Sequence, residues 1–395
     1  MGGHGNSNMM VLYSALGLLL GLLLIAGVLL EAFEAVVLPR RVTRPYRFTR
    51  LYFWSFWKLW RAVALAAFKR TRPREAFLSW FGPLSLLGLF ALWFLGLIVG
   101  FGLFMWSVGM PVQVTAEGKP DLPTYCYLSG VTFFTLGFGD VTPKEPLGRT
   151  LVVVEAGLGF GFLALMVSYL PVLYQAFSRR EVTISMLDAR AGSPPSAAQA
   201  LIRAAGGSTC DALEQFLREW ERWSAEVLES HLSYPVLSYY RSQHDNQSWL
   251  AALTTVLDTC ALLLTGLKEH KPFQSQLTFA MARHAVVDLS LVFQVPPLAP
   301  APDRLPADKL QILRDKLRKA GLELRADPAV DAKLAELRGL YEPFVNALAQ
   351  HFLLALPPID PEHTTVDNWQ TSAWTRRTPG IGKLPIRDPS DEHFD

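Results

Sequence analysis

The order of apolar and polar positions divides this chain into an apolar first half and a polar second half. Three apolar stretches in the first half are long enough to cross a membrane as helices, because about 20 residues span the hydrocarbon. They are residues 10–39, 83–109 and 147–177. A shorter apolar segment, residues 123–134, lies between the second and third stretches and ends in a Gly-rich run. We therefore expect an all-α membrane protein with three spans and one segment that enters the membrane without crossing it.

The distribution of charge gives these spans an orientation. Residues 40–80 hold eleven basic residues and one acid, Glu75, and basic loops stay in the cytoplasm. Only Lys119 and Lys144 are basic between residues 110 and 148. We expect a multi-pass protein of the cell membrane with its N-terminus outside and its C-terminal half in the cytoplasm. The alternative for residues 10–39 is a cleaved signal peptide, although no Lys or Arg precedes the apolar run.

An amphipathic helix is expected within the basic loop. One face would be cationic and consist of Arg47, Arg50, Lys58 and Arg61. The opposite face would be aromatic and apolar and consist of Tyr52, Phe53, Phe56, Trp60 and Val63. This pattern is typical of a helix in the membrane interface, with aromatic rings at headgroup depth and cations toward anionic lipid. An ordinary amphipathic helix packed on protein is the alternative. Glu31 and Glu34, at the end of the first span, are expected near the headgroups.

The Gly-rich run after the short apolar segment is Thr135-Leu136-Gly137-Phe138-Gly139-Asp140. Glycine adopts positive φ without steric cost, so the run can alternate its handedness and point successive carbonyls the same way. Carbonyl rings of this kind can replace the hydration shell of a permeating cation. A Gly-rich turn between two membrane helices is the alternative. Asp121 is placed to cap the short helix that precedes the run.

The segment around this run resembles a known family. Residues 127–143, YLSGVTFFTLGFGDVTP, are similar to the pore helix and filter of tetrameric potassium channels, whose core is Thr-x-Gly-(Tyr/Phe)-Gly-Asp. The resemblance covers residues 83–174 and is to the prokaryotic type with two spans and one pore, here with an extra N-terminal span. It implies a passive potassium channel that needs no cofactor, with K⁺ as the permeant ion. One chain carries one filter, so the working unit is expected to be a homotetramer.

The resemblance also implies roles for residues of the filter. K⁺ would be coordinated by the Thr135 hydroxyl and by the carbonyls of Thr135, Leu136, Gly137 and Phe138. Gly139 would complete the set of filter residues. Tyr127 lies where the family places an aromatic side chain that hydrogen-bonds the acid after the filter, here Asp140. Phe134 and Leu136 depart from the usual motif, which keeps a weakly selective cation channel open as an alternative.

The third span carries the residues expected to form the gate. Helical spacing puts Phe160, Leu163, Val167 and Pro171 on one stripe, and an apolar stripe that lines the cavity can close it by dewetting. Pro171 is expected to kink the helix near the inner mouth. Gly159 lies at the depth of the gating-hinge glycine of the family, although close helix packing explains it equally well.

Glu155 is the ionisable residue inside the third span, and such residues are functional candidates. Helical geometry turns it away from the Phe160–Pro171 stripe and toward the back of the pore helix. We therefore favour a structural or filter-bracing role, with a hydroxyl partner or a proton, over ion binding.

The C-terminal half has the periodicity of helices. The expected helices are residues 212–232, 247–267, 273–293, 307–320 and 330–354, the last kinked or broken by Pro343. Residues 247–267 are interpreted as a buried core helix, and a fourth span is the alternative. The expected domains are an N-terminal span with the interfacial helix (1–80), a pore domain (81–180), a helical cytoplasmic domain (181–356) and a mobile tail (357–395).

Several functions find no support in the composition. Cys126, Cys210 and Cys260 have no metal-ligand spacing, and the histidines are scattered. No catalytic constellation appears, so the chain is not expected to be an enzyme, and a net charge of +2 indicates no nucleic-acid partner. The leading hypothesis is a potassium channel gated at the inner helix by the cytoplasmic domain. A membrane-anchored sensor or scaffold with a vestigial pore is the alternative from another class.

Overall fold

A computed structural model of the chain describes residues 3–38, 47–115, 119–192, 194–205, 210–243, 247–267 and 272–361. The chain folds into two compact units. The first contains residues 1–62 and 80–174, and the second contains residues 63–79 and 175–395. The expected boundaries at 80/81 and 180/181 differ from this division in one main respect. Residues 63–79, at the end of the basic loop, group with the C-terminal half.

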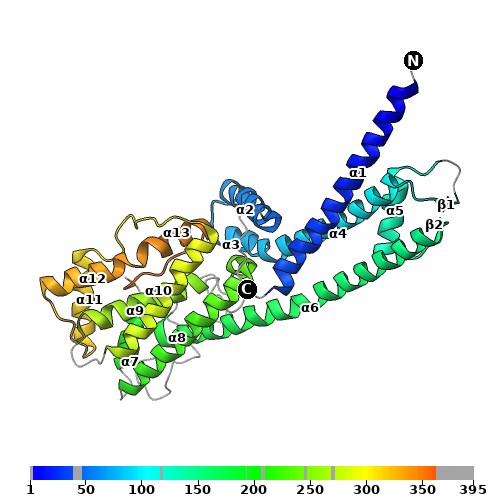
Figure 1. Cartoon of the computed structure of the whole chain (residues 1–395). Coiled ribbons are helices and arrows are strands. Elements are labelled where there is room, and N and C mark those ends of the chain that lie inside the picture. The colour runs from blue at the N-terminus through cyan, green and yellow to red at the C-terminus, as the bar shows by residue number, and fades with distance from the viewer. Residues whose placement is uncertain are drawn as a thin grey trace. The chain divides into compact units, whose positions relative to one another are not determined.

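The first unit is built on membrane-length helices. Its helices are α1 (Gly3–Ala32) with a π-helical continuation (Phe33–Val37), most of α2 (Phe48–Ala67), α4 (Phe81–Ser107), α5 (Leu122–Phe133) and the first part of α6 (Pro146–Ala191). Figure 1 shows α1 against α4, and α5 packs on α4 as well. The protein is a multi-pass membrane protein with four candidate spans, of which three match the expected stretches.

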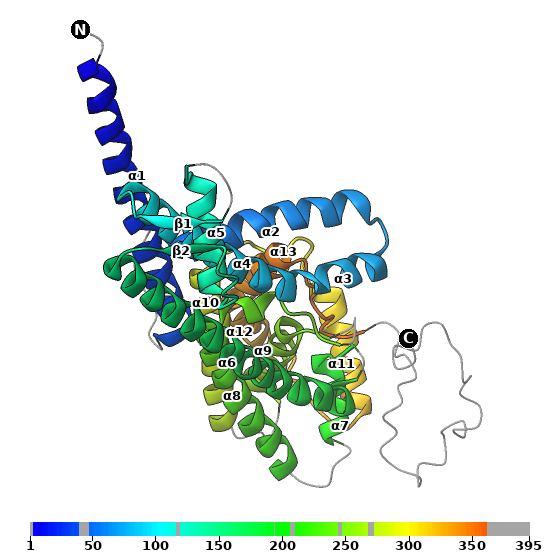
Figure 2. The ribbon, with the colours of Figure 1, turned by 90° about the vertical axis from the view of Figure 1, so that its right-hand side faces the viewer.

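A two-stranded antiparallel sheet, which the expected all-α fold does not include, supports the loops around the Gly-rich run. Strands β1 (Val112–Val114) and β2 (Val141–Pro143) pair in the register Gln113 to Thr142, and both views place them beside α5 (Figures 1 and 2). Val112 and Val141 are buried in one apolar cluster with Phe101 and Met105 of α4 and Leu128 of α5. The sheet therefore fixes the segment that follows the Gly-rich run.

Helix α2 packs on protein along much of the face expected in lipid. The rings of Trp57 and Phe56 lie 4.8 and 5.3 Å from the Phe81 ring at the start of α4, measured between centroids. Tyr52 donates to the Ser85 carbonyl at 2.9 Å. The apolar side chains of α2 that stay exposed include Leu51, Trp54 and Leu59, and also Val63 of the expected apolar face. The alternative of a helix packed on protein is correct for the Tyr52–Phe56 side.

Glu31 caps α2 instead of lying free among headgroups. Its carboxylate accepts from the backbone N–H of Phe48 and of Thr49, both at 3.1 Å, and from the Thr49 hydroxyl at 2.6 Å. The side chain is buried. These bonds satisfy unpaired donors at the start of a helix, which is the role of an N-cap. The expected cations Arg40, Arg41 and Arg44 lie outside the described residues.

The second unit is a helical domain arranged around α9. Its helices are α3 (Thr71–Ser79), α7 (Ala197–Ala205), α8 (Cys210–Ser233), the 3-10 helix η2 (Pro235–Tyr239), α9 (Trp249–Gly266), α10 (Phe273–Phe293), α11 (Ala307–Lys319), α12 (Pro328–Gly339) and α13 (Glu342–Phe352). Helices α7, α8, α10, α12 and α13 pack against α9 or its neighbours. Among the described helices of this unit, α3, α7 and η2 have no counterpart among the expected helices.

Helix α9 is apolar enough to be a candidate span, but the chain itself covers it. In its 18-residue apolar window 89% of the residues are buried within the structure, compared with 22% for α1 and α6. A helix that is apolar on all sides and covered by protein is a core helix. The structure therefore favours the core interpretation of this segment.

A buried ionic cluster ties α9 to the C-terminal helices. Arg304 donates to both carboxylate oxygens of Asp258, at 3.1 and 2.6 Å, and to Glu342 Oε1 at 3.1 Å. Burial, and then the charge of Asp258, raise the pKa of Tyr341 well above its usual value. The Tyr341 hydroxyl therefore keeps its proton and donates to Asp258 Oδ1 at 2.6 Å. Arg338 bonds Glu342 in turn, at 3.1 Å.

The last described residues correct the expected extent of the tail. Ile359 is 2% exposed, and its carbonyl accepts from Ala198 N at 3.0 Å. The Pro357 carbonyl accepts from Arg304. Residues 357–361 thus belong to the packed domain because their backbone groups are bonded to it, and residues 362–395 lie outside the described residues. Helices α12 and α13 separate at Leu340 and Tyr341, just before Pro343.

Replacing Asp258 by Asn should destabilise the second unit, because Arg304 would lose the buried charge that faces it. Removing one partner of a buried pair costs about 3–5 kcal/mol. We expect a lower midpoint of thermal unfolding for the full chain in detergent. The control is Asp315→Asn, which disrupts an exposed pair with Arg318 and should have little effect. An unchanged midpoint in Asp258→Asn would mean that this cluster does not stabilise the domain.

Candidate ion-conduction site

The helix that leads to the Gly-rich run begins at a capping box. The Asp121 side chain accepts from Thr124 N at 3.1 Å, and the Thr124 hydroxyl accepts from the Asp121 backbone N–H at 3.4 Å. Pro lies in the first turn, where a missing N–H is not needed. The Asp121 cap expected from the sequence is therefore present, and α5 starts within one residue of the expected position.

The run after α5 alternates its backbone handedness. Thr135, Gly137 and Gly139 have φ angles of 55°, 63° and 78°, whereas Leu136 and Phe138 do not adopt positive φ. Such alternation turns successive carbonyls toward one side of an extended segment. Among the residues described, none donates a hydrogen bond to the carbonyls of residues 135–138. These oxygens are available to a cation.

Asp140, the last residue of the run, holds the C-terminal end of the run in place. The Tyr127 hydroxyl donates to Asp140 Oδ2 at 2.9 Å, which is the contact expected from the sequence. The other carboxylate oxygen accepts from Val141 N at 3.1 Å. Thr115 donates to the Asp140 carbonyl through its N–H at 3.0 Å and its hydroxyl at 3.1 Å. The side chain and backbone of Asp140 thus connect α5, β2 and the end of β1.

Aromatic side chains pack next to the N-terminal end of the run. Phe134 lies 5.4 Å from Phe133 and 6.0 Å from Phe94 of α4, both edge to face. Phe162 of α6 lies 5.7 Å from Phe94. Phe134 lies where the potassium-channel motif that this segment resembles has a small hydroxyl residue, and its ring joins α5 to α4. This contact gives the departure from the motif a structural reason.

Glu155 of α6 bonds the pore helix rather than an open cavity. The Ser129 hydroxyl of α5 donates to Glu155 Oε1, and both side chains are 0% exposed. Glu155 Oε2 has no hydrogen-bond partner in the part of the chain that the structure describes. The pairing with a hydroxyl agrees with the expected geometry. It favours a bracing role, because the carboxylate is covered on the back of α5.

Gly159 lies where α6 passes directly beneath the end of the pore helix. A Cβ atom there would lie 2.3 Å from the Phe133 carbonyl oxygen, which is much closer than real contacts. The same atom at Gly157 or Gly161 would meet nothing within 4 Å. Close packing therefore accounts for Gly159, and α6 continues as one helix through this position and through Pro171.

The expected gate stripe is uncovered within the single chain. Phe160 and Val167 are 68% and 70% exposed, Pro171 is exposed and Leu163 is half-buried. Leu136 and Phe138 of the run are 54% and 66% exposed. Both the run and α6 therefore carry exposed apolar side chains within the single chain.

The described segment matches a family model for ion channels over residues 91–175, from within α4 through the run and into α6. This segment is an ion channel domain. Its family consists of channels, which confirms that the chain is not an enzyme.

Individual relatives match over different lengths. Segments of 99 and 102 residues are 32% identical to potassium channel subfamily U member 1 of mouse and of Macaca fascicularis, covering 25% and 26% of this chain. The chain spans only 8% of the length of each of these relatives. Over 240 residues the chain is 24% identical to the uncharacterized membrane protein YdjJ of Bacillus subtilis, covering 59% of this chain and 69% of that protein. This alignment is longer than the ion channel domain. No solved structure matches the chain.

Replacing Gly159 by Ala should separate α6 from the pore helix in the ion channel domain. Inserting a methyl group into a packed contact costs about 1–3 kcal/mol. We expect a lower unfolding midpoint of the full chain in detergent. Gly157→Ala is the matched control, and it should keep or raise the midpoint because Ala favours helix. If Gly159→Ala were as stable as the control and only gating changed, a hinge role would replace the packing role.

Proposed function

We propose that this chain is the subunit of a homotetrameric, potassium-selective channel that conducts K⁺ passively. The observation that carries the proposal is the alternation of φ over residues 135–139 within an ion channel domain. Four such segments around one axis would surround a cation with backbone oxygens, as its hydration shell does. Coordination is assigned to the carbonyls of Thr135, Leu136, Gly137 and Phe138, the Thr135 hydroxyl and Gly139.

The tetramer is supported by what one chain lacks. A single run of carbonyls lines one side of an ion, and the chain has one such run. The exposed Leu136, Phe138, Phe160 and Val167 side chains form apolar surface next to it. A second copy of the chain would cover part of this surface, and the remainder of the α6 stripe would line the pore.

Tyr127 and Asp140 brace the filter in this proposal, and Glu155 braces the pore helix through Ser129. The gate is assigned to Leu163, Val167 and Pro171 on α6, where an apolar constriction can exclude water. Gly159 serves the gate by letting α6 approach the pore helix. The C-terminal domain is cytoplasmic and acts on the gate through α6, and the N-terminus lies outside. Anionic lipid contacts the basic segment around α2.

Two other functions make distinct predictions. A weakly selective cation channel is supported by Phe134 and Leu136, which depart from the family motif. A sensor or scaffold with a vestigial pore is supported by the size of the helical domain alone. Conduction is favoured over a vestigial pore, because the contacts of Asp140 and Phe134 hold both ends of the filter segment in place.

Gly137→Asp should abolish K⁺ flux from liposomes that contain the full chain. Asp at φ 63° is strained, and relief of the strain would disturb the alternation that points successive carbonyls to one side. Gly109→Asp is the matched control, because Gly109 also has φ 63° and open space around it but lies outside the filter. We expect the control to retain flux.

Equal loss of flux in both variants would show that general strain, not the filter, is responsible. Absence of K⁺ flux in the wild-type chain, with correct folding and assembly, would contradict the proposed function and favour the scaffold.

A further inference from the structure

Arg180 is a buried arginine on α6, nine residues beyond Pro171. It is 3% exposed, and its guanidinium donates to the carbonyls of Leu237 at 2.9 Å and Tyr240 at 3.0 Å. Glu181 balances its charge at 2.8 Å. A planar guanidinium can bond two carbonyls at once in a fixed geometry, which a lysine cannot do. Arg180 therefore fixes the short segment of residues 235–241 to α6.

His231 adds a directional bond to this contact. Burial, and then the charge of Arg180, lower the pKa of His231 well below its usual value, so the ring is neutral. Its Nδ1 lies 2.7 Å from the Val227 carbonyl and carries the proton that this contact requires. Nε2 then accepts from Arg180 Nη1 at 3.2 Å. Arg180 thus reaches α8 as well as residues 235–241.

The other end of the same segment holds a different helix. Arg241 forms an ion pair with Glu75 of α3 at 3.3 Å, and its side chain is 9% exposed. It also donates to the carbonyls of Phe352 and Leu353 at the end of α13. Helix α3 ends at Ser79, and α4 of the ion channel domain begins at Phe81. Tyr240 and Arg241 are adjacent, so contacts to α6 and to α3 meet within one segment.

We propose that residues 235–241 act as a clasp that couples the helix leaving the pore, α6, to the helix leading into it, α3. Arg180, Glu75 and Arg241 are its positioning residues. The inference rests on the proposed function, because it assigns to these residues the transmission of domain movement to the gate. A movement of the clasp changes Arg180 contacts and Glu75 contacts together.

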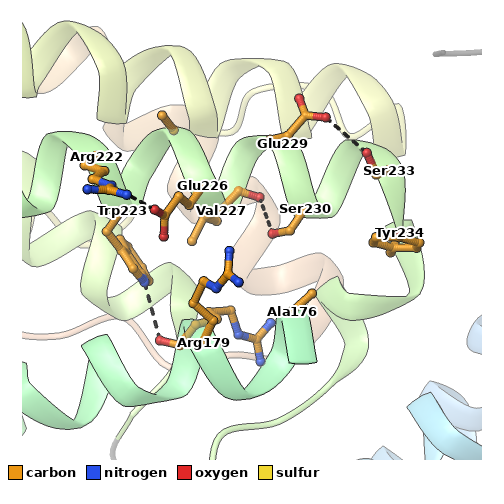
Figure 3. Close-up of a pocket in the computed structure, with 12 residues that line it drawn as sticks. Ala176, Arg179, Arg222, Trp223, Glu226, Val227, Glu229, Ser230, Ser233 and Tyr234 are labelled. Carbon is orange, nitrogen blue, oxygen red and sulfur yellow. Dashed lines mark hydrogen bonds and ion pairs between the residues drawn. The ribbon is translucent and has the colours of Figure 1, made fainter. Parts of the chain in front are cut away.

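Residues of α6 and α8 line a groove that extends to Tyr234, the residue before the clasp (Figure 3). Its volume is about 550 Å³, and Ala176, Arg179, Trp223, Ser230 and Tyr234 are among its lining residues. Apolar packing between the two helices is therefore incomplete at this level. The polar contacts remain, including the bond from Trp223 Nε1 to the Arg180 carbonyl at 3.4 Å, drawn dashed in Figure 3. Such a joint can shift without opening a packed core.

Hydrogen exchange of the full chain in lipid nanodiscs tests the coupling without requiring conduction. Arg180→Lys keeps the charge but loses the two-carbonyl grip. We expect amide exchange to accelerate by at least about fivefold, the lower end for coupled sites, in residues 235–241 and also in residues 71–79 of α3. Arg222→Lys is the control, because Arg222 lines the same groove in an exposed pair with Glu226.

The reciprocal variant keeps the test valid if Arg180→Lys does not fold. Glu75→Gln should accelerate exchange in residues 176–184 of α6 as well as in α3, because coupling between two sites is mutual. Glu336→Gln, which removes an exposed pair with Lys333, is its control. If each variant loosened only its own contact, the two ends would be independent and the clasp would be wrong.

Potassium flux separates the clasp from the proposed function. In liposomes, Arg180→Lys and Glu75→Gln should each change the K⁺ flux by at least about fivefold while selectivity stays at the wild-type value. Wild-type flux in both variants would overturn the clasp. If the two variants showed coupled hydrogen exchange but the wild-type chain passed no K⁺, the proposed function alone would be contradicted.

Discussion

The structure depends on one constraint, which is that the carbonyls of residues 135–138 receive no hydrogen bond from any of the described residues. This backbone lies between two candidate spans, where an unsatisfied polar group is costly unless it faces water or an ion inside protein. Alternating φ directs the oxygens to one side, and neighbouring contacts keep them there. Tyr127 and Thr115 hold Asp140 at one end, and Phe134 packs at the other.

The contacts behind the pore helix serve the same constraint. Gly159 lets α6 pass beneath Phe133, and Ser129 bonds Glu155 within the covered space between α5 and α6. Both contacts fix the carbonyl end of α5, whose negative dipole end favours a cation. The second unit follows a related rule. Buried charges there are paired, as Arg304 with Asp258 and Arg180 with Glu181 are.

The sequence predicted elements whose cause is local and missed those whose cause is tertiary. The membrane-length helices, the Asp121 cap and the alternation at Gly137 and Gly139 depend on nearby residues, and the structure contains all of them. The cap that Glu31 gives to α2 joins residues 17 and 18 positions apart, so no local pattern announces it. Strands β1 and β2 are too short for an alternating pattern to identify them.

The partners of buried polar side chains lie far from them in the sequence. Arg180 reads as a charge that stops a span at the membrane surface, and only the fold shows its carbonyl partners 57 and 60 residues away. Asp258 reads as an interruption of an apolar run, although it anchors Arg304 and Tyr341. The apolar Phe134 follows the same rule, because it departs from the motif that the segment resembles and only the fold shows its ring against Phe94. The roles of such residues depend on partners far away in the sequence, and the spacing of residues along the chain does not reveal those partners.

The central claim is that the carbonyls of residues 135–139 select K⁺, and the most direct measurement of it is a reversal potential. The purified chain is reconstituted in a planar bilayer between two solutions of equal total cation concentration, one mostly K⁺ with some Na⁺ and the other mostly Na⁺ with some K⁺. The account predicts a reversal potential close to the equilibrium potential of K⁺. A reversal potential near zero would contradict potassium selectivity and indicate a cation pore that does not discriminate between the two ions.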